Sequence, residues 1–97
     1  GRVRLGDGRE LEISGQIDRL AETADAILLA DFKTGAPRAA EATPERILRQ
    51  FALYRAALQP LWPGKAIRAL LIWTGGPDVV ELKASALDAA LERLAAP

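Results

Sequence analysis

Three residues that could act on a phosphodiester bond lie on two neighbouring segments of the chain. Asp18 ends the stretch Gly-Gln-Ile-Asp at residues 15–18, and Asp31 and Lys33 flank Phe32 in the stretch Asp-Phe-Lys-Thr. Carboxylate oxygens suit Mg²⁺ or Mn²⁺, and a bound ion would polarise a phosphoryl oxygen and lower the pKa of a bound water. A neighbouring lysine would neutralise the charge that grows on the phosphate. These residue types therefore predict a divalent-metal site for phosphodiester hydrolysis, with the backbone carbonyl of Phe32 as a further ligand.

Two predicted strands bring these residues together. Residues 26–33 are apolar on both faces, as in a buried strand, and the strand period sets Asp31 and Lys33 on one face. Residues 10–21 alternate apolar and polar side chains, which predicts one strand with Asp18 in its polar series. A turn at residues 22–25 would make an antiparallel hairpin and set Asp18 across from Ala30 or Asp31. The two carboxylates would then converge, although an aspartate and a lysine two apart also fit a solvated face or a cross-strand ion pair.

A helix is predicted after this hairpin. Thr43 suits the cap, Pro44 the first helical position and Glu45 the positive end of the helix. Apolar side chains then recur at helical intervals, up to the prolines at positions 60 and 63: Ile47, Phe51, Tyr54, Leu58 and Leu61. Gln50 and Tyr54 are four apart and share one face of the helix. Either both support a site, or Tyr54 belongs to the apolar stripe and Gln50 flanks it.

The remaining segments complete a small mixed sheet. We expect strands at residues 2–5, 67–73 and 79–82, the first of them in a hairpin with the strand that contains Leu11. The strand–helix–strand unit at 26–73 predicts a right-handed crossover with parallel strands. A last helix capped by Ser85 would place three leucines against the core: Leu87, Leu91 and Leu94. The predicted fold class is therefore α/β (α+β), with antiparallel hairpins followed by a β-α-β crossover and flanked by helices.

Composition limits the range of functions. A chain of 97 residues can form one small core, so we expect a single domain over residues 1–97. Basic and acidic residues are equal at 13 each, which argues against strong stand-alone binding of nucleic acid. The chain has no histidine or cysteine, which excludes a thiol nucleophile, a Ser-His-Asp triad, an ordinary zinc site and a cysteine-ligated iron–sulfur cluster within it. No apolar run is long enough for a membrane span, and the lack of cysteine is compatible with the cytoplasm.

The order of the motifs resembles the RecB-type branch of the PD-(D/E)xK nuclease superfamily. Gly-x-Ile-Asp, Asp-Phe-Lys-Thr and Gln-Phe-Ala-Leu-Tyr, over roughly residues 12–82, are most similar to the C-terminal nuclease domain of AddA-type helicase–nuclease subunits. The resemblance implies a restriction-endonuclease-like core in which Asp18 and Asp31 bind the metal. It also implies that Phe32 donates its carbonyl to the metal and that Lys33 is catalytic.

The same resemblance implies supporting residues and a biological setting. Gln50 and Tyr54 match the motif that supports the active site and the DNA strand, and Thr34 follows the lysine as it often does in these enzymes. AddA-type subunits process DNA double-strand breaks for recombination in the bacterial cytoplasm, with an AddB-type partner and with ATP bound in separate helicase domains. The expected substrate is DNA and the expected cofactor is Mg²⁺ or Mn²⁺, with no iron–sulfur cluster and no membrane contact.

One departure from the family affects these expectations. Relatives generally carry a further metal ligand, often histidine, on a helix before the first strand, and this chain has no histidine. We therefore expect a fragment of a larger polypeptide that lacks the N-terminal helix and that, in isolation, binds metal weakly and has weak or no activity. Two other interpretations stay open: a catalytically silent nuclease-like module that holds partner subunits or DNA, and an unrelated small α+β domain.

Several basic residues also allow two interpretations. Residues 35–42 are rich in alanine, proline and glycine and predict a mobile connection, in which Arg38 either sits on a plain linker or contacts DNA. Arg46, Arg49 and Arg55 on the predicted helix are either solvated charges or phosphate contacts.

Overall fold

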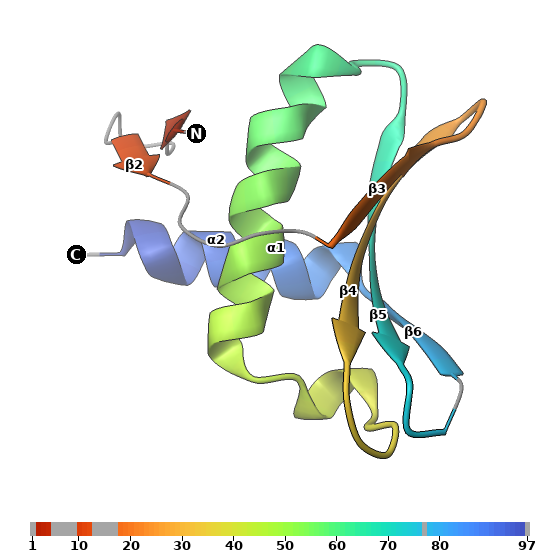
Figure 1. Cartoon of the computed structure of the whole chain (residues 1–97). Helices are drawn as coiled ribbons and strands as arrows, with labels where there is room; N and C mark the ends of the chain where they lie inside the picture. Colours follow the sequence, from red (N-terminus) through yellow and green to blue (C-terminus); the bar gives the residue numbers. More distant parts are fainter. Residues whose placement is uncertain (1, 5–9, 13–17, 77, 97) are drawn as a thin grey trace.

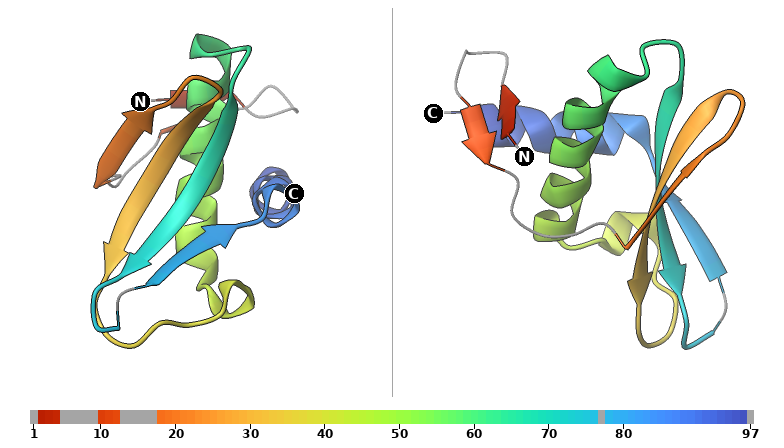
Figure 2. Two further views of the ribbon diagram at one scale, coloured as in Figure 1. Left: turned by 90° about the vertical axis from the view of Figure 1, so that its right-hand side faces the viewer. Right: turned by 45° about the horizontal axis from the view of Figure 1, so that its top comes forward.

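A four-stranded mixed sheet with helices on one face forms the body of the molecule (Figure 1). The computed structural model describes residues 2–4, 10–12, 18–76 and 78–96. The elements in chain order are β1 (Arg2–Arg4), β2 (Glu10–Glu12), β3 (Arg19–Glu22), β4 (Ala26–Lys33), the 3₁₀ turn η1 (Ala40–Ala42), α1 (Glu45–Leu58), the 3₁₀ turn η2 (Gln59–Leu61), β5 (Ala66–Trp73), β6 (Asp78–Leu82) and α2 (Ala84–Ala95). The sheet order is β3-β4-β5-β6, and both α1 and α2 lie on the same side of it (Figure 2). The predicted fold class is confirmed.

The hairpin that carries the first carboxylate forms as predicted. Thr23 closes the turn, because its hydroxyl accepts a hydrogen bond from the Ala26 N–H at 3.0 Å and its own N–H donates to the Ala26 carbonyl at 2.8 Å. Strands β3 and β4 then pair antiparallel, with Arg19 opposite Ala30. Asp18 therefore lies one residue before β3, on the line that continues this register to Asp31.

The prediction of one strand over residues 10–21 is wrong. β2 pairs with β1 in a separate two-stranded sheet, with Val3 opposite Leu11, while β3 begins only at Arg19. A hairpin between two short neighbouring segments has a low entropic cost of loop closure, so β2 forms its backbone hydrogen bonds with β1. The connection between β1 and β2 and the first three residues of the motif at 15–18 lie outside the described residues.

The crossover connection determines which strand ends meet. β4 and β5 pair in parallel from Ala26 opposite Ala66 to Lys33 opposite Trp73, and α1 connects them. The predicted parallel crossover is thus confirmed. β6 returns antiparallel beside β5, with Ala69 opposite Leu82. The carboxyl ends of β4 and β5 therefore lie side by side, next to the turn that leads into β6.

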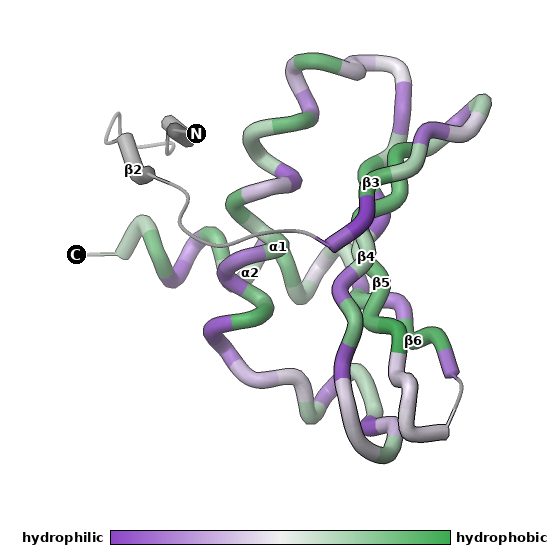
Figure 3. The backbone as a smooth tube through the Cα atoms, in the orientation of Figure 1, coloured by the Kyte–Doolittle hydropathy of each residue, from purple (hydrophilic) through white to green (hydrophobic). Residues whose placement is uncertain are grey.

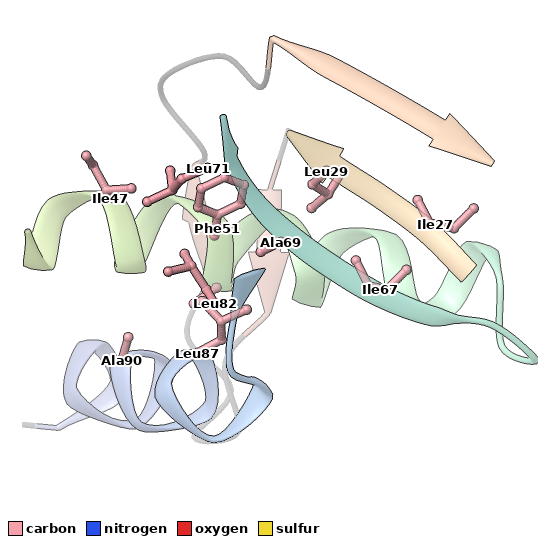
Figure 4. Close-up of a cluster of buried hydrophobic side chains, with 11 residues drawn as sticks. Ile27, Leu29, Ile47, Phe51, Ile67, Ala69, Leu71, Leu82, Leu87 and Ala90 are labelled. Atoms are coloured by element: carbon pink, nitrogen blue, oxygen red, sulfur yellow. The ribbon is translucent and has the colours of Figure 1, made fainter. Parts of the chain in front are cut away.

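The core fills the space between the sheet and the two helices (Figure 4). Its side chains come from β4, β5, β6, α1 and α2: Ile27, Leu29, Ile47, Phe51, Ala52, Ile67, Ala69, Leu71, Leu82, Leu87 and Ala90. The hydropathy colouring shows the same distribution, with hydrophobic residues along β4 and β5 and at intervals on both helices (Figure 3). Leu61 does not continue the predicted stripe and is 66% exposed, because α1 ends at Leu58.

The two predicted helix caps are wrong. α1 begins at Glu45 after Pro44 without a side-chain cap, and the Thr43 hydroxyl is buried without a hydrogen-bond partner among the described residues. α2 begins at Ala84, so Ser85 lies within its first turn, and no side chain caps this helix either.

Ion pairs between side chains tie the helices together. Arg93 on α2 lies 2.7 Å from Glu45 on α1, and Arg55 on α1 lies 2.5 Å from Asp88 on α2.

Leu87 is buried on α2, and Leu91 packs against the core from the next turn. Within the described ranges, neither helix has the length and apolar character needed to cross a membrane.

Candidate active site

The first carboxylate is fixed by the backbone of the neighbouring strand. The Oδ2 atom of Asp18 accepts a hydrogen bond from the N–H of Phe32 at 2.9 Å. This bond joins two residues that are 14 apart in the sequence, at the place where the β3–β4 ladder ends. It holds the Asp18 carboxylate over the last residues of β4, where the sequence predicts it.

The second carboxylate and the lysine lie on the buried side of β4. Asp31 is 8% exposed, and its Oδ2 lies 2.9 Å from the Lys33 Nζ. Side chains two apart on a strand share a face, so both follow Ile27 and Leu29 on the side that α1 covers. Phe32 points to the other side of the sheet and is 44% exposed. At the end of β4 the charged pair therefore lies on the core side of the sheet, whereas charges on an ordinary solvated face point to water.

The Asp18 and Asp31 carboxyls affect each other, and their pKa values shift in opposite directions. Burial raises the pKa of the Asp31 carboxyl, and its hydrogen bond with Asp18 raises the pKa further, against the lowering effect of Lys33. The hydrogen bond from Asp31 lowers the pKa of Asp18, and the bond from the Phe32 N–H adds to this. Within the pair, Asp31 therefore takes up a proton more readily than Asp18 does. Two carboxyls in such contact favour a positive charge between them.

This donor set fits a hard divalent cation. Mg²⁺ is commonly held by one or two carboxylates with water as its remaining ligands, and Asp18 and Asp31 supply two in contact. In the described part of the chain, no third His, Cys, Asp or Glu side chain joins Asp18 and Asp31 in a group that could hold a metal ion. The carbonyl of Phe32 as a third ligand remains a prediction.

The backbone carbonyl of Lys33 accepts hydrogen bonds from Thr74, a residue that the sequence did not single out. Thr74, just after β5, donates to the Lys33 carbonyl from its N–H at 2.9 Å and from its hydroxyl at 3.2 Å. The following Gly75 lies so close to Gly35 that a Cβ on Gly75 would overlap the Gly35 backbone. The Thr-Gly-Gly run after a buried strand is the only sequence signal of this contact, and by itself it predicts no more than a turn.

A hollow of about 190 Å³ opens beside Lys33. Its lining combines basic, polar and apolar side chains: Lys33, Thr34, Arg38, Pro44, Arg46, Ile47, Leu71 and Trp73. Thr34 is exposed just after β4 and lines this hollow next to Lys33, and its role in the active site stays a prediction. The connection at 35–42 is not a plain mobile linker, since it contains η1 and lies against the β5–β6 turn.

The two predicted helix residues lie outside this hollow. Tyr54 is half-buried and packs against the core, in agreement with a place in the apolar stripe. Gln50 is also half-buried, and each of the two residues interacts with a neighbour. Their contact with the active site or DNA stays a prediction.

Comparisons with known proteins identify the superfamily of the chain. Residues 2–96 match the PD-(D/E)XK nuclease superfamily, and the chain belongs to that superfamily. It is also similar to a Lactiplantibacillus plantarum ATP-dependent helicase/nuclease subunit, with 41% identity over 59 residues. The matched segment is 61% of this chain but 5% of that protein, so the chain spans a small part of its relative's length. No solved structure matches the chain.

Proposed function

We propose that the chain is a metal-dependent nuclease domain that hydrolyses DNA phosphodiester bonds. The observation that carries the proposal is the meeting of Asp18, Asp31 and Lys33 at the end of β4, with the Lys33 Nζ 2.9 Å from Asp31. An aspartate that is 8% exposed is expensive to keep in a small domain. A catalytic role gives a reason for its burial that a surface ion pair does not.

The roles of the residues follow from their surroundings. Asp18 and Asp31 would hold Mg²⁺ or Mn²⁺, with the Phe32 carbonyl beside them, and the ion would supply a polarised phosphate and a water of lowered pKa. Asp18 is kept ionised and oriented by the Phe32 N–H. Lys33 neutralises the charge that grows on a non-bridging phosphate oxygen during in-line attack of water. The bond to the 3′ oxygen breaks, which leaves a 5′-phosphate and a 3′-hydroxyl.

The wider setting of this domain is also proposed. The name of the relative, an ATP-dependent helicase/nuclease subunit, supports a parent protein that joins this domain to ATP-dependent helicase domains. Such a parent would process DNA double-strand breaks for recombinational repair in the bacterial cytoplasm, together with an AddB-type partner. Residues 1–97 would then be one nuclease domain within it.

One observation favours a second candidate function. Because the described residues offer the metal two carboxylates and no third acidic or histidine side chain, the domain fits a catalytically silent module that holds DNA or another protein of the complex. The two functions differ in whether Lys33 is needed for cleavage.

The test is the variant Lys33→Ala in the intact protein, with Lys83→Ala as the matched control. Lys83 is exposed, precedes α2 and has no ion pair among the described residues. We expect Lys33→Ala to lower the rate of single-stranded DNA cleavage in Mg²⁺ by about 100-fold or more, the usual loss when a charge-stabilising donor is removed. Lys83→Ala should cleave like wild type. Unchanged cleavage in a folded Lys33→Ala protein would rule out the proposed active site.

A further inference from the structure

The hollow beside Lys33 gathers positive charge. Lys33 comes from the end of β4, Arg38 from the following connection and Arg46 from the first turn of α1, and all three line the same space with the hydroxyl-bearing Thr34. No acidic side chain is among the lining residues. We call the space lined by Lys33, Thr34, Arg38 and Arg46 the basic pocket.

The two arginines of the basic pocket differ from the other arginines around them. Arg49 and Arg93 both pair with Glu45, and Arg55 and Arg68 pair with Asp88 and Glu81. Among the residues that the structure describes, neither Arg38 nor Arg46 has such a partner. Two arginines that line one small space without a counter-charge among the lining residues favour an anion there.

The lining also offers donors of the kind that phosphate needs. Guanidinium groups bind phosphate oxygens through paired N–H donors, and the Thr34 hydroxyl adds a neutral donor. The indole Nε1 of Trp73, another lining residue, is buried without a hydrogen-bond partner among the described residues. The pocket has an apolar side formed by Ile47 and Leu71, so the donors act in a partly dry space.

The location of the pocket indicates which phosphate it takes. Lys33 is common to both sites, because its Nζ contacts Asp31 and its side chain lines the pocket. We propose that the basic pocket binds a backbone phosphate of the DNA strand adjacent to the scissile phosphate. The identity of the strand rests on the proposed nuclease function, whereas the pocket's affinity for phosphate rests on its own charges. The scissile phosphate would lie at the carboxylate pair and its neighbour between Arg38 and Arg46.

The connection that carries Arg38 is held in place for this role. Gly35 lies against Gly75, and Gly76 lies under the ring of Pro37, so the turn after β5 supports the segment just before Arg38. The Thr74 bonds to the Lys33 carbonyl anchor the other end of the same segment. Arg38 is thus presented from a supported loop, which lowers the entropy lost when it binds a phosphate.

The test is DNA binding by the intact protein with the double variant Arg38→Gln/Arg46→Gln. A single-stranded oligonucleotide is bound in Ca²⁺ without ATP, and the affinity is measured over a range of salt concentrations. We expect weaker binding and a plot of log affinity against log salt whose slope is smaller by about 0.7 for each phosphate that the variant no longer binds. The single variant Lys83→Gln removes a charge outside the pocket and should leave the slope as in wild type.

A second measurement identifies the phosphate. Oligonucleotides with one neutral methylphosphonate, moved stepwise along the strand, should show one position at which wild type loses affinity and the double variant loses none. An unchanged salt slope in a double variant with a wild-type melting temperature would overturn the proposal. The proposal would also be overturned if inorganic phosphate displaced the oligonucleotide from wild type while the double variant kept the wild-type salt slope. The pocket would then bind a free anion and not a DNA phosphate.

Failure of the nuclease function has a different signature. Suppose that Arg38→Gln/Arg46→Gln lowers the salt slope of DNA binding while Asp31→Asn cleaves DNA as fast as wild type. The phosphate pocket is then supported and the proposed active site is wrong.

Discussion

Asp31 is a buried, ionisable side chain, which is an unfavourable choice at a position whose only role is structural. The residue is 8% exposed, and its carboxylate pairs with the Lys33 Nζ at 2.9 Å. Replacing a buried polar cluster by apolar residues of similar size is often neutral or stabilising. The cluster is therefore better explained by the catalytic role proposed for it than by a contribution to stability.

The sequence predicted which residues meet but not how they bind one another. The strand period placed Asp31 and Lys33 on one face, and counting back from the turn placed Asp18 opposite Ala30 or Asp31. The hydrogen bond from the Phe32 N–H to Asp18 and the burial of Asp31 depend on side-chain conformation and on α1 above the strand. The spacing of apolar and polar residues along the sequence predicts neither this hydrogen bond nor the burial of Asp31.

A prediction at the residue scale concerns Glu45. Hydrogen bonds from Arg93 and Arg49 lower the pKa of its carboxyl below the unfolded value, against burial, which raises it. The stabilisation is therefore present above the unfolded pKa and is lost as the pH falls through the lower, folded pKa. We expect Arg93→Gln to lower the melting temperature at neutral pH and the difference from wild type to shrink in acid.

Thermal unfolding followed by circular dichroism over this pH range checks it, with Lys83→Gln as the control that shows no such convergence. A constant difference between Arg93→Gln and wild type at all pH values would contradict the ion-pair explanation.

At the scale of elements, the turn between β5 and β6 acts as a support for the end of β4. Thr74 binds the Lys33 carbonyl, and Gly75 touches the backbone of Gly35, which has a positive φ of 93°. Only glycine allows both the close approach at 75 and the left-handed backbone at 35 without strain. The turn after β5 thus supports the end of β4 through backbone contacts and through the Thr74 hydroxyl.

Gly75→Ala tests this support. The added methyl group would overlap the Gly35 backbone, so we expect the free energy of unfolding to fall by about 1–3 kcal/mol, as for other overpacked sites. Cleavage should fall as well, because Thr34 and Arg38 would shift with the loop.

Gly64→Ala is the matched control, since no atom lies within 4 Å of its added Cβ and its φ is not positive. It should be neutral or stabilising by about 0.4–1 kcal/mol. Denaturant unfolding of the two variants beside wild type gives the comparison, and equal stabilities would show that the 35–75 contact has no importance.

The elements predicted best were those with a strong pattern. The buried β4 and β5, the parallel crossover and the stripe on α1 followed from hydrophobic periodicity. Helix starts were predicted poorly, because Thr43 and Ser85 are suitable cap residues by type but neither side chain caps a helix here. The break between β2 and β3 was also missed, since an alternating pattern does not say which partner strand each half will choose.

At the scale of the whole molecule, the sheet has two unequal faces. Both helices cover one face (Figure 2), and Asp31 and Lys33 lie where the carboxyl ends of β4 and β5 meet. On the other face, Phe32 and Val79 are 44% and 57% exposed. Membership of the nuclease superfamily agrees with a site at this edge, whereas the motor, the repair pathway and the AddB-type partner are proposals for this chain.

The central claim is that Asp18 and Asp31 form a metal site for DNA cleavage. The most direct measurement is cleavage of single-stranded DNA by the intact protein in Mg²⁺, with wild type beside Asp31→Asn, and with partner and ATP supplied. Asparagine keeps the shape of the side chain but removes its charge. We expect a loss of about 100-fold or more in the variant, since metal-held charge stabilisation is worth several kcal/mol. Mg²⁺ should also raise the melting temperature of wild type but not of Asp31→Asn. Equal cleavage by the two proteins, or none by a well-folded wild type, would contradict the account.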